Sequence, residues 1–248
     1  MRFIKNIIFS VWRIFVPNSQ PIFIMAHMRS GSSLLEHILS SNPEIFGAGE
    51  QSRIYATSTD LKKGELLIRR INNTLFKPYK YSTDQILHKK YTPNLDLIRS
   101  NTIKVVFLIR NPEETISSIE KLGGPYGIYE KNAFSSSEYY INRLEYLVNL
   151  SSQIPERNQI FITYEELVTE TEHTLKKLNS FLELKTVLKK EYNVKQTTGK
   201  FGDTSKNIKE GTIINTKKKL IKIDIKTKVK LDNLYKETSL LLRKRNND

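Results

Sequence analysis

The stretch Pro21-Ile-Phe-Ile-Met-Ala-His-Met-Arg-Ser-Gly-Ser-Ser33 decides the fold of this chain. Its apolar run from Ile22 to Ala26 predicts a buried strand, and a short polar loop follows. Helical spacing then appears in Leu34, Leu35, Ile38 and Leu39. At the start of a helix the backbone N–H groups lack intrahelical partners and the helix dipole is positive. The order strand, loop, helix therefore predicts a site that binds an anion.

The loop residues suit a phosphoryl or sulfuryl group. Arg29 offers a charged guanidinium, Ser30 and Gly31 are small enough for close approach, and Ser32 and Ser33 add hydroxyl donors. The Gly-x-x-x-x-Gly-Lys-Ser/Thr pattern of nucleoside triphosphatases is absent from this position. Arginine thus stands where the usual phosphate-binding loop has lysine. A plain serine-rich turn is the alternative interpretation of the loop.

A second stretch, Lys104-Val-Val-Phe-Leu-Ile-Arg-Asn-Pro-Glu-Glu-Thr-Ile-Ser-Ser118, repeats this pattern. The run from Val105 to Ile109 predicts a central strand of a parallel sheet, and Arg110 follows directly. Ligands of open α/β sheets bind at the carboxyl ends of the strands, so we expect Arg110 on the same edge as Arg29. Ser118 lies about two helical turns further on. Alternatively, Arg110 pairs with one of the two glutamates that follow it.

These stretches resemble the sulfotransferase family, whose sulfuryl donor is 3′-phosphoadenosine 5′-phosphosulfate (PAPS). The segment 27–35 looks like the family's 5′-phosphosulfate loop, and 110–118 looks like its 3′-phosphate motif. The segment 40–50 resembles the family's stretch behind the first helix, and 162–170 resembles its late strand and Tyr-Glu-x-Leu helix. The blocks occur in family order over roughly residues 21–214.

The resemblance implies an α/β fold with a mainly parallel central sheet flanked by helices, of the P-loop-like type. It assigns the donor to Arg29, Ser30, Gly31, Ser32, Ser33, Arg110, Ser118, Tyr164 and Ser205. Ser205 lies in a turn-rich stretch, 199–211, that is similar to the family's late loop over the nucleotide. No metal is implied, because sulfuryl transfer needs a base, cations at the bridging oxygen and in-line geometry.

Glu50 is the first candidate for the general base. Gly49-Glu-Gln-Ser-Arg53 resembles the Gly-Glu-x-x-Arg stretch of Golgi-type sulfotransferases, whose glutamate is the base. The alternative is a surface carboxylate that pairs with Arg53. His88 is the rival base, because cytosolic members of the family use a histidine, although its local sequence matches poorly.

Two lysines are candidates for the cation at the bridging oxygen. Related sequences often have lysine where this chain has Gln85, so Lys90 or Lys89 is the candidate, and both could instead face solvent. Arg29 is counted with the catalytic residues as well as with the donor site.

Composition supports one α/β domain. The chain has 248 residues, a formal net charge of +14, no cysteine and four scattered histidines without metal-ligand spacing. We predict a basic amphipathic segment at 1–20, a sulfotransferase domain at 21–214 and a basic extension at 215–248 packed on it. In the extension, alternation of Ile221, Ile223 and Ile225 predicts a strand before a helix. Elsewhere, Thr169 and Glu172 predict a capping box that opens a helix through Leu182.

The expected reaction moves a sulfuryl group from PAPS to a hydroxyl or amine, and the expected acceptor is a carbohydrate or glycolipid. A small-molecule kinase with the same loop is the alternative enzyme, and a non-catalytic polyanion-binding protein is the alternative of another class. No specific nucleic-acid partner is predicted. A cytoplasmic location is expected, with residues 1–16 either at the inner membrane surface or packed on the domain. The lysine-rich end is interpreted as a solvated face rather than a ligand-binding tail.

Overall fold

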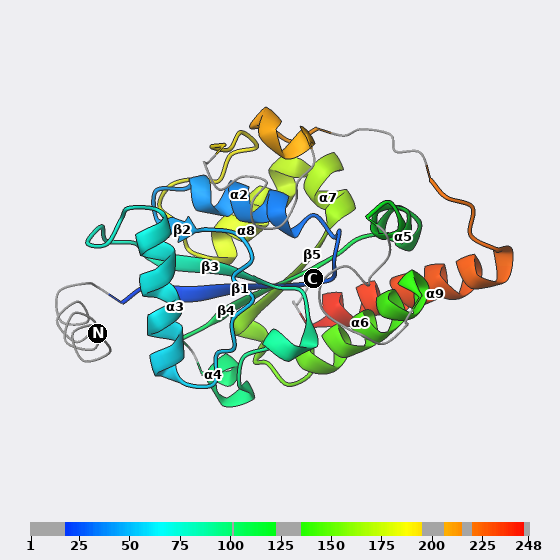
Figure 1. The fold of residues 1–248 in the computed structure, drawn as a ribbon, viewed down its shortest axis with the longest axis horizontal. Helices are drawn as coiled ribbons and strands as arrows, with labels where there is room; N and C mark the ends of the chain where they lie inside the picture. Colours follow the sequence, from blue (N-terminus) through cyan, green and yellow to red (C-terminus); the bar gives the residue numbers. More distant parts are fainter. Residues whose placement is uncertain (1–17, 101, 123–134, 195–205, 215–219, 246–248) are drawn as a thin grey trace.

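The computed structural model describes residues 18–100, 102–122, 135–194, 206–214 and 220–245. Five parallel strands form the central sheet in the order β2-β3-β1-β4-β5 (Figure 1). The strands are β1 Gln20–Ala26, β2 Ile45–Gly47, β3 Tyr81–Ile86, β4 Lys104–Ile109 and β5 Gln159–Thr163. The predicted fold class, a parallel sheet flanked by helices, is confirmed.

Helices cover both faces of this sheet (Figure 1). One face is covered by α2 Ser32–Ser41, α7 Tyr164–Thr169 and α8 Thr171–Phe181. The other face is covered by α4 Leu95–Arg99, α5 Pro112–Glu120, α6 Ser136–Ser151 and α9 Ile225–Lys244. Helix α3, Ser58–Ile71, packs beside β2, and short 3₁₀ turns span Lys89–Tyr91, Glu156–Asn158 and Lys206–Glu210.

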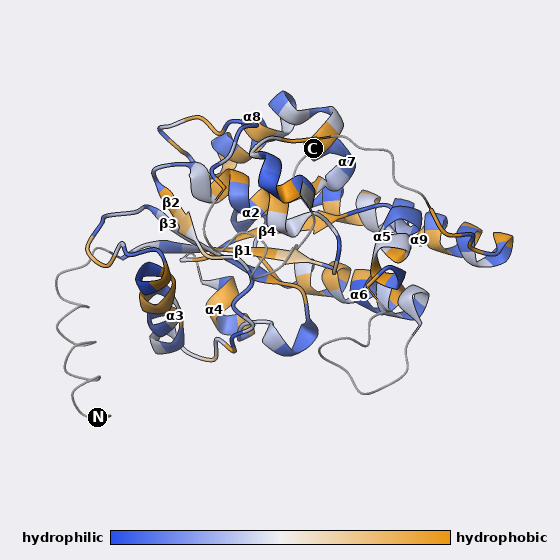
Figure 2. Cartoon of the chain, turned by 45° about the horizontal axis from the view of Figure 1, so that its top comes forward, coloured by the Kyte–Doolittle hydropathy of each residue, from blue (hydrophilic) through white to orange (hydrophobic). Residues whose placement is uncertain are grey.

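Alternate strand residues serve the two faces. Ile22 and Ile24 of β1 belong to the core under α2 and α8, whereas Phe23 and Met25 belong to the core under α6 and α9. Figure 2 shows hydrophobic residues gathered on the central strands and interleaved with hydrophilic ones along the helices. This two-sided burial explains why β1 and β4 are continuous apolar runs rather than alternating ones.

Strand register brings the loops after the central strands to one edge. Ala26 of β1 is in register with Leu108 of β4, and Met25 is in register with Ile86 of β3. The segments that begin at His27, Leu87 and Arg110 therefore leave the sheet side by side.

Two local predictions are wrong. Residues 220–224 form no strand: Ile221 and Ile223 pack on the helical core, Ile221 N–H donates to Ser117 Oγ (3.0 Å), and Ile225 already begins α9. Thr169 ends α7, donating from Oγ1 to the carbonyl of Glu165 (2.8 Å), and Glu170 stands at the N-cap of α8. Residues 1–17 of the predicted segment at 1–20 lie outside the described residues, as do residues 199–205 of the turn-rich stretch 199–211.

Candidate active site

The loop between β1 and α2 is built around two left-handed backbone positions. Arg29 has φ 62° and Gly31 has φ 94°. A Cβ atom on Gly31 would lie 2.4 Å from Cδ2 of Tyr164, so both the angle and the space require glycine. Ser32 and Ser33 open α2 and are buried, and the hydroxyl of Ser30 is buried without a partner among the described residues. Small polar side chains therefore lie at the N-terminus of α2.

The two motifs meet at this loop. Arg29 Nε donates to Ser118 Oγ (2.9 Å), and Arg110 Nη1 donates to the carbonyl of Arg29 (3.4 Å). The guanidinium of Arg110 lies 3.9 Å from the ring centroid of Tyr164, a cation–π contact. Arg110 also pairs with Glu114, the alternative expected from the sequence. Four residues assigned to the donor from three separate segments thus gather at one edge of the sheet.

His27 joins the two loops, which the sequence did not predict. Its Nδ1 lies 2.8 Å from the carbonyl of Met28, which can only accept, so Nδ1 carries the proton. Its Nε2 accepts the backbone N–H of Arg110 (3.0 Å). Burial lowers the pKa of His27 to about 3, and this neutral tautomer fits both contacts. Helix α6 supports the same place, because Tyr139 Oη accepts Met28 N–H (2.8 Å) and Tyr140 Oη donates to the carbonyl of Arg110 (2.7 Å).

A second group of predicted residues lies at the carboxyl ends of β2 and β3. Glu50 accepts a hydrogen bond from Ser52 (3.4 Å), and burial raises its pKa while Ser52 and Lys90 oppose that shift. The pKa of His88 is lowered to about 4. Burial is the main cause, and the positive charges of Arg143 and Lys90 add to it. Lys90, rather than Lys89, is therefore the lysine that interacts with Glu50.

The sequence left open that Lys89 and Lys90 face solvent and that Glu50 pairs with Arg53. Lys89 is exposed and lies 5.4 Å from the ring centroid of Tyr146, on α6. Lys90 is exposed as well. Within the described part of the chain no ion pair joins Glu50 to Arg53.

Asp84, which the sequence analysis did not single out as functional, anchors the loop that carries Glu50. Its buried carboxylate accepts the backbone N–H of Gln51 (3.0 Å) and the hydroxyl of Tyr55 (2.6 Å). Burial raises the pKa of Asp84 to about 7, against the effect of these hydrogen bonds. Gly49, with φ 81°, allows the tight turn into this anchor. The aspartate fixes the backbone on the C-terminal side of the candidate base.

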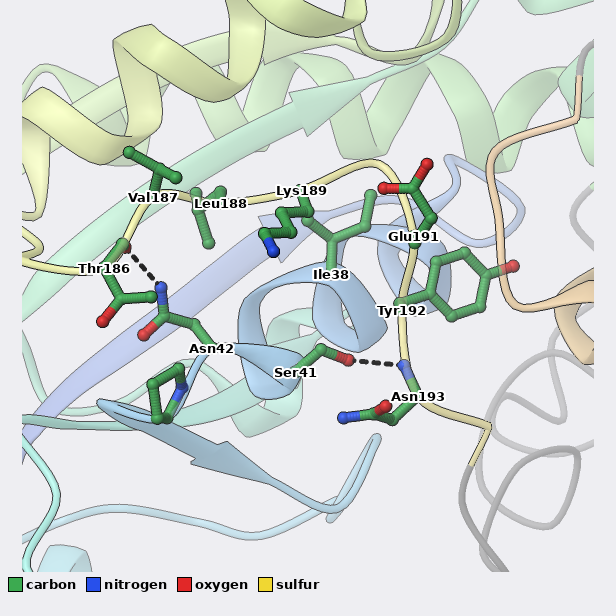
Figure 3. A pocket seen from close by; sticks show the side chains of 11 residues that line it. Ile38, Ser41, Asn42, Thr186, Val187, Leu188, Lys189, Glu191, Tyr192 and Asn193 are labelled. Carbon is green, nitrogen blue, oxygen red and sulfur yellow. Dashed lines mark hydrogen bonds between the residues drawn. The ribbon is translucent and has the colours of Figure 1, made fainter.

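Other features lie outside these two groups. Ser205 lies outside the described residues. Within the described ranges no group of three or more His, Cys, Asp or Glu side chains is arranged to hold a metal ion. None of the described helices is long and apolar enough to cross a membrane. A cavity of about 320 Å³ lies behind the C-terminal end of α2, where Asn42 donates to Thr186 and Ser41 accepts from Asn193 (Figure 3). No residue of either group lines it.

The sulfotransferase family model matches this chain over residues 21–91 and 90–187. The matched ranges contain every predicted site residue except Ser205. No curated protein sequence matches the chain.

Solved structures share the fold. The sulfotransferase domain of the Synechococcus PCC 7002 olefin synthase superposes with a TM-score of 0.57 at 13% identity, over 89% of this chain and 95% of that domain. A sulfotransferase from Alicyclobacillus acidocaldarius gives 0.52 at 13% identity, over 94% and 97%. A mouse sulfotransferase complexed with PAP gives 0.51 at 15% identity, over 96% and 92%. At these identities the likeness shows the fold.

Proposed function

This chain belongs to the sulfotransferase family, and we propose that it transfers a sulfuryl group from PAPS to an acceptor hydroxyl with Glu50 as general base. The observation that carries the proposal is the contact between Arg29 and Ser118, which unites the two predicted phosphate-binding motifs. The neighbouring mouse structure is complexed with PAP, the bisphosphate that PAPS leaves behind, and this supports the same donor here.

In the proposed donor complex, the 5′-phosphosulfate lies on residues 29–33 at the start of α2. The 3′-phosphate lies against Arg110 and Ser118, and the ring of Tyr164 borders the nucleotide. The guanidinium of Arg29 donates to Ser118. This contact supports placing the guanidinium between the 5′-phosphosulfate and the 3′-phosphate of the donor. Ser205 is proposed to close over the nucleotide from the late loop. Charge-assisted hydrogen bonds from two arginines suit such a polyanion.

The proposed reaction is an in-line displacement at sulfur. The Glu50 carboxylate takes the proton of the acceptor hydroxyl as its oxygen forms a bond to sulfur. The bond between sulfur and the bridging oxygen breaks, and its electron pair leaves on the phosphate of adenosine 3′,5′-bisphosphate. Arg29 and Lys90 are positive groups for the charge that develops on that oxygen. No bond to the protein forms, so no nucleophilic side chain is needed.

The burial of Glu50 supports its role as base. Because burial raises its pKa, the carboxylate is a stronger base than one in water. Its neighbour Lys90 favours the ionised form that must accept the proton. Asp84 and Gly49 hold the loop, which supports a fixed position for the carboxylate. His88, neutral at pH 7 because of its lowered pKa, remains the alternative base.

We further propose a carbohydrate or glycolipid as acceptor, on the basis of the Gly49-to-Arg53 pattern. Catalysis is assigned to residues 21–214, with 215–248 as an extension on that domain. Contacts of α9 with α6 and α5 support this arrangement. Contact of residues 1–16 with a membrane surface stays a prediction.

Substitution of the base tests the reaction. Glu50→Gln keeps the size of the side chain but removes the basic carboxylate, so we expect turnover of labelled PAPS to fall about 10²–10⁴-fold. Affinity for adenosine 3′,5′-bisphosphate, measured by calorimetry, should be nearly unchanged. His88→Asn is the matched control and should be much milder. Full turnover by Glu50→Gln together with loss in His88→Asn transfers the role to His88. Tight binding of ATP but not of the bisphosphate would instead indicate a kinase.

A further inference from the structure

Arg143 of α6 is a buried arginine at the carboxyl ends of β1 and β3. Only 4% of the residue is exposed. Its Nε donates to the carbonyl of Ala26 (2.9 Å) and its Nη2 donates to the carbonyl of Ile86 (2.5 Å). These are the last residues of the two strands, so the guanidinium lies where the strands separate. Its third nitrogen, Nη1, is buried and has no hydrogen-bond partner among the described residues.

The positive charge of Arg143 also lacks a counter-ion in the described part of the chain. The phenol groups of Tyr139 and Tyr146 are the groups that favour its charged form, and burial opposes it. Both neighbouring histidines, His27 and His88, are held neutral, partly by this same charge. An unpaired buried charge is costly in a protein interior.

Arg69 shows what a buried arginine looks like when it serves structure alone. It is fully buried on α3, but Nη2 lies 3.1 Å from Glu65 and the guanidinium lies over the ring of Phe46 (4.6 Å). Arg143 has a comparable ring contact, with Tyr146 (5.3 Å to the ring centroid), but no carboxylate partner among the described residues. The difference indicates that the negative charge opposite Arg143 is supplied by something other than the described residues.

The position of Arg143 identifies that charge. Arg29, Arg110 and Ser118 come together where β1 and β4 end, whereas Glu50 follows β2 and both His88 and Lys90 follow β3, on the other side of β1 in the sheet. Arg143 stands between the two groups, because it donates to the carbonyl of Ala26, directly before the first loop, and to the carbonyl of Ile86, two residues before His88. In a donor bound as proposed above, the group that lies between nucleotide and acceptor is the sulfuryl group.

We propose that Arg143 binds the sulfuryl group of the donor, in addition to holding the ends of β1 and β3. The inference rests on the proposed function. PAPS and its product differ by this group alone, so Arg143 distinguishes the loaded donor from the spent one. The same charge stays opposite the sulfuryl oxygens while the group moves from phosphate to acceptor.

The test compares two ligands rather than one. For Arg143→Lys, whose single ammonium cannot serve two carbonyls and a sulfuryl group together, we expect calorimetric affinity for PAPS to fall roughly 10- to 100-fold. Affinity for adenosine 3′,5′-bisphosphate should change less than about twofold. Arg69→Lys is the matched control for loss of a buried guanidinium, and its ratio of the two affinities should equal that of the wild type.

An equal loss of both ligands in Arg143→Lys, or an unchanged ratio, would overturn the proposal and leave Arg143 a structural clamp. A wild-type chain that binds neither ligand would contradict the proposed function itself. Nitrogen-15 NMR of the unsubstituted enzyme gives an answer that does not depend on folding of a variant. The Arg143 guanidinium signal should shift on addition of PAPS and stay in place with the bisphosphate. Identical signals with the two ligands would equally refute the assignment.

Discussion

Arg29 contributes to the site through both its side chain and its backbone. The side chain reaches Ser118 across 89 residues of sequence, and the carbonyl accepts from Arg110 (3.4 Å). The backbone of this residue is left-handed, with φ 62°, and its guanidinium lies against Ser118 of α5. A lysine would keep the charge but lose the planar guanidinium, whose several N–H groups can donate to a hydroxyl and to an anion at the same time.

The first prediction concerns donor affinity. Arg29→Ala and Arg110→Ala should each weaken binding of adenosine 3′,5′-bisphosphate by about 2–3 kcal/mol, as expected for a lost charge-assisted contact. Calorimetry measures the effect, and Arg99→Ala, an exposed arginine on α4, is the control. If both variants bind as tightly as the wild type, the donor lies elsewhere.

The second prediction is a pH profile. Glu50 works as a base only when ionised, so turnover should fall as pH decreases through its pKa. Burial raises that pKa above the ordinary value of 4.5, and the midpoint of the acid limb should lie above 4.5 as well. His88 as base would place the midpoint near its own pKa of about 4. Turnover measured against pH separates the two, and an acid limb that persists in Glu50→Gln would exclude the glutamate.

The sequence predicted the site residues that belong to local motifs. It missed the residues whose role depends on contacts with distant parts of the sequence. Arg29, Arg110 and Ser118 lie within two recognisable motifs, and the structure brings them together. The role of His27 depends on the backbone of Arg110, 83 residues later, and that of Asp84 depends on Tyr55 and Gln51. No short-range pattern contains these contacts.

Among the elements, the strand–loop–helix unit from β1 to α2 depends most on a single residue. Gly31 stands at the N-cap of α2 in a left-handed conformation and faces the ring of Tyr164. The start of α2 and the start of α7 are therefore packed together through a position that admits no side chain. Any change there alters the donor loop and the nucleotide side of the site together.

The third prediction follows from this contact. Gly31→Ala should lower the free energy of unfolding by at least about 1–2 kcal/mol, the cost of a left-handed alanine, with added strain from the ring. Adding Tyr164→Ala should recover part of the loss, because the ring at 2.4 Å is removed. Chemical denaturation of the four chains of this cycle measures the coupling. Strictly additive effects would mean that the ring does not oppose the new methyl group.

The capping boxes show why element boundaries were harder to predict than elements. Two Thr-x-x-Glu patterns lie six residues apart in the sequence, and the prediction named only Thr169 with Glu172. The box actually forms at Thr163 and Glu166, where the end of β5 provides an extended N-cap. The pattern alone does not contain the strand that decides between them. The strand expected near Ile221 was wrong for a related reason, because those isoleucines pack on helices.

Across the whole molecule, some of the basic side chains of α9 form ion pairs with carboxylates of other helices. Lys228 of α9 pairs with Glu113 of α5 (2.9 Å), and Arg243 pairs with Glu166 of α7 (2.7 Å). Tyr235 donates to Glu165 (2.9 Å), the same carboxylate group that caps the backbone of Asn111. These contacts hold α9 against α5 and α7. The lysine-rich sequence of this segment does not predict them.

The last prediction tests whether α9 is part of the folded unit. Leu231 is fully buried in the core beneath α6, whereas Leu241, on the same helix, is 47% exposed. Leu231→Ala removes the same atoms as Leu241→Ala but leaves a cavity, so we expect it to cost about 2–5 kcal/mol of unfolding free energy. Leu241→Ala should cost well under half of that, because its side chain keeps contact with water in the folded state. Urea denaturation followed by both fluorescence and circular dichroism measures the two values. One coincident transition, shifted to lower urea in Leu231→Ala alone, is expected if α9 and the sheet unfold together. A separate early transition with an unshifted main one would mean that α9 detaches independently, and its contacts with α5 and α7 would then contribute little to the site.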